Sequence, residues 1–258
     1  FGRLQSHLLV VSEGKPVDAA APKSRERISL DLSGSWKVDP EEDNALRLDQ
    51  FRMQLDPQSR GLKQGWHKPD YRDSHWLPSE PKPFIEQVKK SSSMSHIPFS
   101  ISSDDSEVPL EIQVNLPLVC WFRTAFLADV VPSKLALVMD RSAILGDCQI
   151  FLTGSRLPSN AFRPTFRYDH SNVTCAIGRR ATRGKNVLAI RVELDQISGG
   201  LVDPFFLFGR FGVRRWRRNA FRITNPVESG PLTRLEDLRM PFYAGTVAYN
   251  REIAFPSQ

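Results

Sequence analysis

The sequence predicts an all-β protein with the layered architecture of a sandwich or barrel, and three observations support this prediction. From Val108 onward, strand-like segments follow one another at short intervals with turn signals between them. No helical pattern alternates with these segments, which argues against a parallel α/β sheet. The 258 residues include 19 prolines and 15 glycines, a composition that indicates many turns and few long helices.

The strongest strand pattern is Val119–Phe126, near the middle of the chain. Phe122 and Phe126 point to one side of such a strand, whereas Trp121 and Arg123 point to the other. Because both sides are largely apolar, we expect this strand to be an interior one.

The segments before this strand are less regular. Residues 1–27 are rich in proline, alanine and charged residues, so we expect an N-terminal extension or linker. Ile28–Val38 is predicted to be the first strand, with a close backbone approach at Gly34 and a buried indole at Trp36. The scattered apolar residues of Pro40–Gln58 suit a short helix, and the serine-rich residues 91–107 suit a long surface loop.

Strand signals continue after the central strand, and a turn is expected at 153–155. The further predicted strands are Leu135–Asp140, Cys148–Leu152, Phe162–Asp169, Asn172–Gly178 and Val187–Leu194. Thr224–Asp237 is interpreted as a linker, and Pro241–Tyr249 as a strand pair that either returns to the first domain or begins a truncated further one. The predicted division is therefore an extension (1–27), a sandwich (28–223) and a linker with a partial β element (224–258).

Six motifs recur in a recognisable order across residues 28–213. They are Leu32–Trp36, Gly65-Trp66 before Asp73–Trp76, Trp121-Phe122-Arg123, Ile150–Gly154, Pro164–Phe166 with Asp169, and Gly184–Val192. The series resembles the sugar-binding β-sandwich that precedes the catalytic barrel in glycoside hydrolase family 2. Phe122 stands where that family usually has Tyr, Thr153 where it has Asn, and the glycines before the Pro-x-Phe motif are missing.

The resemblance implies a jelly-roll-like sandwich of the galactose-binding type, and it favours a secreted or periplasmic protein. It also implies a non-catalytic module that binds carbohydrate or acts as a scaffold for a catalytic domain of the same polypeptide. We find no catalytic carboxylate pair, because Asp140 and Asp169 are interpreted as structural. No Gly-x-Ser-x-Gly elbow or patterned histidine set is present. We expect no cofactor, although loop oxygens of such sandwiches would suit a structural calcium that the sequence does not locate.

Sugar binding needs aromatic faces together with planar polar groups. The candidate aromatic platforms are Trp66, Tyr71, Trp76 and Trp216. The candidate polar partners are Asp73, Arg163 and Arg167. The alternative interpretation, which we favour, is that Trp66 and Trp76 pack beneath their loop. The residues interpreted as structural are Trp36, Trp121, Arg123 and Asp140, with Arg123 expected to meet a carboxylate such as Asp140 under the Trp121 indole.

The formal net charge is +6, and much of it comes from the arginine-rich segment Arg210–Arg222. We favour a solvated edge strand or an interdomain surface for this segment. The alternative is a stand-alone binding or adhesion domain that recognises an anionic glycan or, less favoured, a nucleic acid. No apolar run reaches the roughly 20 residues of a membrane-spanning helix, so no membrane partner is expected.

The chain has three cysteines without metal-like spacing, namely Cys120, Cys148 and Cys175. Free buried thiols are the favoured interpretation, and one disulfide stays open as the alternative.

Overall fold

The computed structural model describes residues 33–90, 100–101, 112–113, 116–217 and 220–253. Over these residues, strands make up nearly all the regular structure, which confirms the predicted all-β class. The exceptions there are a short α-helix, α1 (Phe84–Lys90), and a single 3-10 turn, η1 (Ser159–Ala161). The predicted N-terminal extension and most of the serine-rich loop lie outside the described residues.

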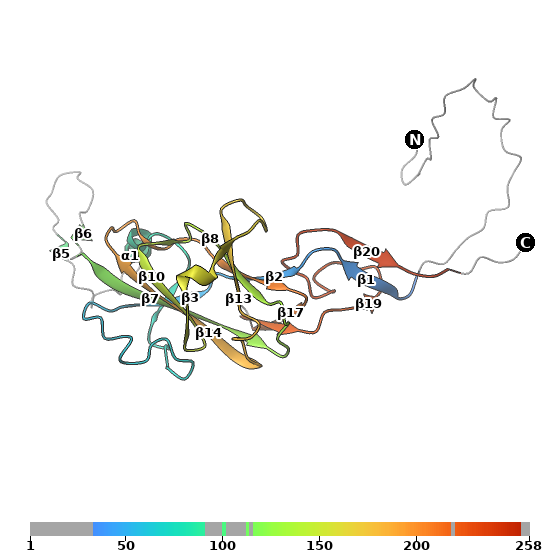
Figure 1. The fold of residues 1–258 in the computed structure, drawn as a ribbon, viewed down its shortest axis with the longest axis horizontal. Coiled ribbons are helices and arrows are strands. Elements are labelled where there is room, and N and C mark those ends of the chain that lie inside the picture. Colours follow the sequence, from blue (N-terminus) through green and yellow to red (C-terminus); the bar gives the residue numbers. More distant parts are fainter. Residues whose placement is uncertain (1–32, 91–99, 102–111, 114–115, 218–219, 254–258) are drawn as a thin grey trace, which may run out of the picture. The chain divides into compact units, whose positions relative to one another are not determined.

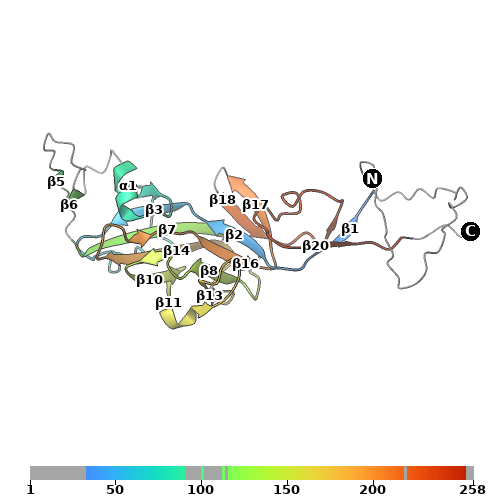
Figure 2. The ribbon, with the colours of Figure 1, turned by 90° about the horizontal axis from the view of Figure 1, so that it is seen from above.

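The larger of two facing sheets is organised around the predicted interior strand. Its long strands β7 (Leu118–Ala128) and β14 (Gly184–Leu194) pair antiparallel along their whole length (Figures 1 and 2). Beyond β14 lie β10 (Asp147–Leu152) and β11 (Ser155–Leu157). On the other edge of β7 lie β3 (Phe51–Leu55), which also pairs with β4 (Leu77–Ser79), and the hairpin of β17 (Gly212–Arg217) and β18 (Ala220–Thr224).

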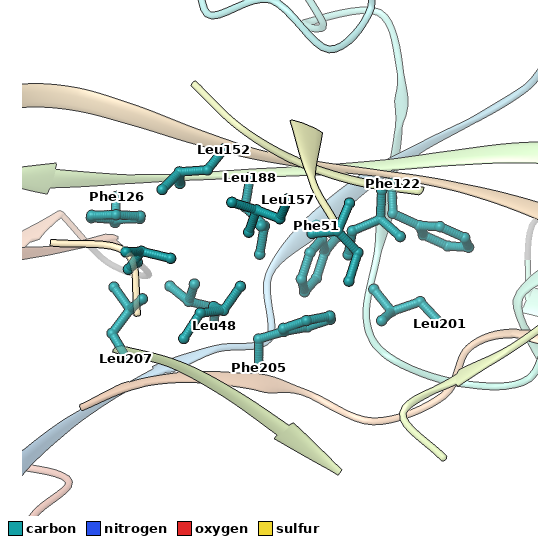
Figure 3. Packing of buried hydrophobic residues seen from close by; sticks show 14 of the residues in the cluster. Leu48, Phe51, Phe122, Phe126, Leu152, Leu157, Leu188, Leu201, Phe205 and Leu207 are labelled. Atoms are coloured by element: carbon teal, nitrogen blue, oxygen red, sulfur yellow. The ribbon is translucent and has the colours of Figure 1, made fainter. Parts of the chain in front are cut away.

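The second sheet packs against the first and encloses the hydrophobic core. Its strand order is β12 (Arg163–Pro164), β13 (Asn172–Ala176), β8 (Ala136–Asp140), β16 (Phe205–Gly209) and β2 (Asn44–Leu48). Figure 3 shows Phe122, Phe126 and Leu188 of the larger sheet opposite Phe205 and Leu207 of the second. Two faces with period-two apolar residues are thereby removed from water together, which is the main stabilisation that this architecture offers.

The helix expected within Pro40–Gln58 was wrong, because this segment forms strands β2 and β3. Apolar and polar residues alternate on either side of a turn. The buried apolar residues are Leu46 and Leu48 before the turn, and Met53 and Leu55 after it. That spacing of two is strand periodicity, and both strands bury their apolar residues in the core.

The first strand of the described chain joins the last. β1 (Trp36–Pro40) pairs antiparallel with β20 (Val247–Asn250) and with β19 (Ser229–Gly230), as the blue and red strands of Figure 1 show. The strand predicted within Pro241–Tyr249 thus returns to the beginning of the described chain. The domain boundary at residue 223 stays a prediction.

Three smaller details complete the fold. Two further short pairs are β9 (Ile144–Leu145) with β15 (Gly200–Leu201), and β5 (Ser100–Ile101) with β6 (Ile112–Gln113). Trp36 is half-buried rather than buried, and the Arg251 guanidinium lies 5.8 Å from its ring centroid. All three thiols are free; Cys120 and Cys175 are buried, whereas Cys148 is exposed, contrary to the expected burial.

Candidate functional site

A loop of residues 61–76, called here the covering loop, packs on the outward face of β7. Its Trp66 and Trp76 rings lie 5.2 Å apart, edge to face, and the Trp66 ring lies 6.1 Å from the Trp121 ring. Trp66 is 8% exposed and Trp76 1% exposed, and half-buried Tyr71 packs against the same cluster. The two tryptophans therefore present little ring face to a ligand, and their role as sugar platforms stays a prediction.

Arg123 anchors the covering loop to the sheet. Its Nε donates to Asp73 Oδ2 at 2.9 Å, and its Nη1 donates to the Trp66 carbonyl and to the Lys68 carbonyl. Its Nη2 donates to the Tyr71 carbonyl at 3.3 Å. The guanidinium is fully buried, so these bonds replace the water that it loses on folding.

The partner expected for Arg123 was wrong, and so was the ring expected to cover it. The carboxylate is Asp73 instead of Asp140, and the rings near the guanidinium are Tyr71 at 5.5 Å and Trp76 at 5.7 Å instead of Trp121. Neighbouring β-strand residues point to opposite faces, so an arginine and a tryptophan two positions apart share a face without having to touch.

Trp121 instead binds a buried carboxylate that the sequence analysis did not single out. Its Nε1 donates to Asp56 Oδ2 at 3.0 Å, and Asp56 also accepts the backbone N–H groups of Arg60 and Gly61. Asp56 is 3% exposed and therefore needs these three donors. The covering loop is thus anchored at its start through Asp56 and further along through Arg123.

Asp140 belongs to a polar turn at the end of the second sheet. Its carboxylate accepts hydrogen bonds from the Ser142 hydroxyl, the Ser171 hydroxyl and the Ser142 backbone N–H. These donors favour the charged form and hold the pKa of Asp140 below its ordinary value. Asp140 therefore binds serine groups of this turn instead of Arg123, and its structural role stays a prediction.

The remaining predicted ligand residues do not gather with the tryptophans of the covering loop. Arg163 is exposed on β12, and Arg167 pairs with Asp43 at 3.1 Å. Trp216 is 53% exposed on β17, and its ring lies 4.2 Å beneath the Arg222 guanidinium. The predicted set is therefore spread over the covering loop, β12, the residues after β12, and β17, and it does not form one site.

The structure instead contains an open cleft where the large sheet has a gap. On one edge of β7, β3 pairs as far as Arg123, and the parallel strand β18 begins to pair at Leu127. Neither strand pairs with the intervening residues 124–126. A cleft of about 510 Å³ opens there, within the ~300–1,000 Å³ typical of small-molecule sites.

The cleft combines aromatic edges with polar groups. The Phe221 and Phe242 rings meet edge to face at 5.0 Å on one side. The turn between β2 and β3 contributes Asp49 and Gln50 to the lining of the cleft. Thr124 lines the cleft from the gap itself. Aromatic rings beside hydrogen-bonding side chains are the combination that carbohydrate recognition needs.

A second hydrogen-bond network holds the segment that carries Phe242. The next residue, Tyr243, donates its hydroxyl to Glu42 Oε2 at 2.7 Å, and the Thr246 backbone N–H donates to the same oxygen at 2.9 Å. These two donors keep the pKa of Glu42 below its usual 4.5. One wall of the cleft therefore depends on an ionised carboxylate.

Most of the residues that line the cleft were not identified from the sequence. Lys185, Arg52 and Arg215 belong to three separate strands, and no short motif connects them. Arg215 falls inside the arginine-rich segment, which was the one available signal. Asp73 and Arg123 also line the cleft, so it begins where the covering loop is anchored.

The described part of the chain contains no group of three or more His, Cys, Asp or Glu side chains placed to hold a metal ion. The structural calcium stays a prediction. No helix in these described ranges is long and apolar enough to cross a membrane.

No protein-family model and no curated protein matches the chain. Among solved structures it is similar to the β-glucuronidase from Ruminococcus gnavus. The structure in complex with a C6-substituted uronic isofagomine is 13% identical with a TM-score of 0.43, over 69% of this chain and 32% of that one. The complex with D-glucaro-d-lactam is 14% identical with a TM-score of 0.44, over 70% and 33%. This chain spans about a third of those chains. At these values the likeness concerns the fold alone, and the family stays the prediction made from the motifs.

Proposed function

We propose that this chain is a non-catalytic module that binds carbohydrate in the cleft, and that it does so within a glycoside hydrolase. The observation that carries the proposal is the gap beside residues 124–126, where an open cleft of about 510 Å³ joins aromatic edges to polar side chains. The resemblance of the motif series to the sandwich of glycoside hydrolase family 2 supports a catalytic domain of the same polypeptide that would act on the same glycan.

The backbone of β7 adds to this chemistry. Residues 124–126 have no strand partner on the open edge, and alternation along β7 directs the backbone groups of Ala125 to that edge, where they can bond with hydroxyl groups of a ligand. The Phe221 and Phe242 edges supply an apolar contact for the C–H face of a sugar ring.

A scaffolding role is the second candidate, and the anchoring of the covering loop favours it. A loop held by a fully buried guanidinium is built for rigidity. A rigid outer surface suits a domain that supports a neighbour, with or without a bound sugar.

The arginine-rich segment gives less support to the alternative of a polyanion-binding domain. Arg210 donates to the Pro40 and Glu41 carbonyls, and Arg222 pairs with Asp129 at 3.0 Å. These two arginines bind groups of this same chain, whereas Arg215 lines the cleft.

The test is a glycan array of neutral, uronic and sulfated oligosaccharides, followed by calorimetry on the best binder. Ala220→Trp should fill the cleft and weaken binding by at least ~10-fold, about 1.4 kcal/mol. Ser155→Trp, on the exposed edge strand β11 outside the cleft, is the matched control and should bind like wild type. Absence of binding to every glycan would refute carbohydrate binding, and unchanged binding by Ala220→Trp would place the site elsewhere.

A further inference from the structure

The cleft carries an excess of positive charge. Its lining includes five cationic side chains and two carboxylates. The cations are Arg47, Arg52, Arg123, Lys185 and Arg215, and the carboxylates are Asp49 and Asp73. The lining therefore has a formal charge of +3, which is five minus two.

Both carboxylates are already paired. Asp49 forms an ion pair with Arg47 at 3.1 Å, and Asp73 accepts from the buried Arg123 at 2.9 Å. Within each pair the two charges cancel, so three cations remain to face the cleft.

The first of the remaining cations, Arg52, is held in place without being neutralised. Its Nη1 donates to the Ser74 and Trp76 carbonyls, at 3.1 Å each. Carbonyl groups orient the guanidinium but carry no net charge, so its positive field persists at the cleft.

The other two cations reach the cleft from strands on opposite edges of β7. Lys185 is exposed at the start of β14, opposite Leu127 of β7. Arg215 is exposed on β17, opposite Phe221, with its guanidinium 5.7 Å from the Phe221 ring centroid. Within the described residues, neither side chain forms an ion pair with a carboxylate.

These two cations also come from opposite faces of the large sheet. Lys185 shares the face of Val187 and Ala189, which is the face that the covering loop occupies further along. Arg215 shares the face of Val213, which packs in the core. A ligand in the gap would therefore meet positive charge from both sides of the sheet.

We infer that the saccharide bound in this cleft is acidic, and that Lys185 and Arg215 recognise its carboxylate or sulfate groups while Arg52 adds to the field. This inference rests on the proposed function. A cleft with one sign of charge and protein walls concentrates the field and favours ligands of the opposite sign. Binding should weaken as salt rises, because the two recognising side chains are exposed.

The experiment compares three probes on the full chain by calorimetry: trigalacturonic acid, its methyl ester, and a sulfated galactose oligosaccharide. The acid and its ester differ in charge but have the same ring. We expect at least one charged probe to bind ~10-fold or more tightly than the ester, a difference that falls as salt rises from about 20 to about 200 mM. The relative affinities of the acid and the sulfated sugar distinguish a carboxylate from a sulfate.

Variants assign the charge to residues. Lys185→Gln and Arg215→Gln should each weaken the charged probe by ~3–10-fold and leave the ester unaffected. Arg214→Gln is the matched control, because Arg214 neighbours Arg215 on β17, is exposed and does not line the cleft. Thermal unfolding of each variant verifies that the fold is intact.

Failure of this inference and failure of the proposed function have different results. If the ester binds as tightly as the charged probes and Ala220→Trp abolishes both, the cleft binds neutral sugar, and only the inference of an acidic ligand is wrong. If Ala220→Trp leaves all binding unchanged, the cleft is not the site and the proposed function is also wrong. Equal loss for Arg214→Gln and Arg215→Gln, or absence of binding to all three probes, would also overturn the inference.

Discussion

Two neighbouring parts of the strand β7 have opposite surroundings. As far as Arg123, the outward face lies under the covering loop, and β3 pairs with the edge of the strand. Beside the next three residues, 124–126, the loop and a strand partner on that edge are both missing and the cleft opens, although β14 stays paired with the other edge. The Arg123 guanidinium is fully buried, whereas Ala125, two residues further along the strand, is exposed.

This contrast shows that the most conspicuous aromatic residues are not the most accessible ones. Trp66, Trp76 and Trp121 pack on one another and hold a loop in place. The cleft beyond them is lined by lysine, arginine and phenylalanine side chains that come from several strands. Aromatic residues stabilise a fold through buried area, so a cluster of them indicates packing at least as readily as ligand binding.

The largest expected effect concerns the anchored part. Arg123→Leu leaves Asp73 without its buried partner and removes hydrogen bonds to three loop carbonyls. We expect the free energy of unfolding to fall by ~3–5 kcal/mol, as for other broken buried pairs. Urea denaturation of wild type and variant measures this difference.

The matched control is Arg191→Leu on the adjacent strand, directly opposite Trp121. Arg191 also pairs with a carboxylate, Glu193, but that carboxylate is 42% exposed, so the expected loss is about 1 kcal/mol or less. If Arg123→Leu kept the stability of wild type and abolished glycan binding, Arg123 would be a ligand residue, and the contrast between the two parts of β7 would collapse.

A second prediction tests how tightly the loop is packed. A Cβ atom at Gly61 would lie 2.6 Å from Trp121 Nε1 and 2.8 Å from Asp56 Oδ2, so Gly61→Ala forces their hydrogen bond apart. We expect a loss of ~1–3 kcal/mol. Gly230→Ala is the control, because a Cβ there meets its nearest atom at 3.8 Å and the change should stay within about 0.5 kcal/mol. Equal unfolding midpoints for the two variants would mean that the loop yields easily.

A third prediction concerns the turn that packs beside the covering loop. Thr153 has φ 48° and Gly154 has φ 86° in the two-residue connection between β10 and β11. A β-branched residue is strained in that region, whereas asparagine adopts it readily. Thr153→Asn should therefore raise the free energy of unfolding by ~0.5–1 kcal/mol, measured by urea denaturation. A decrease would indicate that the 3.3 Å bond from Thr153 Oγ1 to Asn186 outweighs the backbone strain.

The smallest effect concerns acid and the wall of the cleft. Because the folded pKa of Glu42 is lowered, its contribution to stability is present above its usual value of 4.5 and is lost as pH falls through the folded pKa. The protection factor of the Thr246 amide, which is its exchange rate by NMR relative to the intrinsic rate at the same pH, should therefore fall below about pH 4.5.

Glu42→Gln isolates this effect, because Asp140 and Asp169 also have lowered pKa values and lose their own turn contacts in acid. In the variant, the Thr246 protection factor should no longer change with pH in this range, while the covering loop is unaffected. A variant that kept the pH dependence of wild type would exclude Glu42 as the group that holds this wall.

Much of the fold could be predicted because strand periodicity is local. The alternation of Val119–Phe126 sufficed to predict an interior strand, and the all-β class followed from many such segments. The helix expected within Pro40–Gln58 shows the limit of this reasoning. In this segment the apolar residues before the turn belong to β2 and those after it belong to β3. A single stretch of sequence therefore contains two short strand patterns, which together do not look like one strand.

The site was much less predictable, because its residues converge only through long-range pairing. Arg52, Lys185 and Arg215 are brought together by β3, β14 and the hairpin of β17 and β18 around a single strand. The partner of Arg123 is decided in the same way, since Asp73 lies fifty residues away in the chain.

The sequence by itself determined the strand character of the chain, the burial of Trp121 and Arg123 on an interior strand, and the aromatic loop before it. Only the tertiary structure decided which carboxylate meets Arg123, that β1 pairs with β20, and that β7 has an unpaired gap. The physical reason is that side-chain alternation depends on adjacent residues, whereas strand order and register depend on segments that are far apart in the sequence.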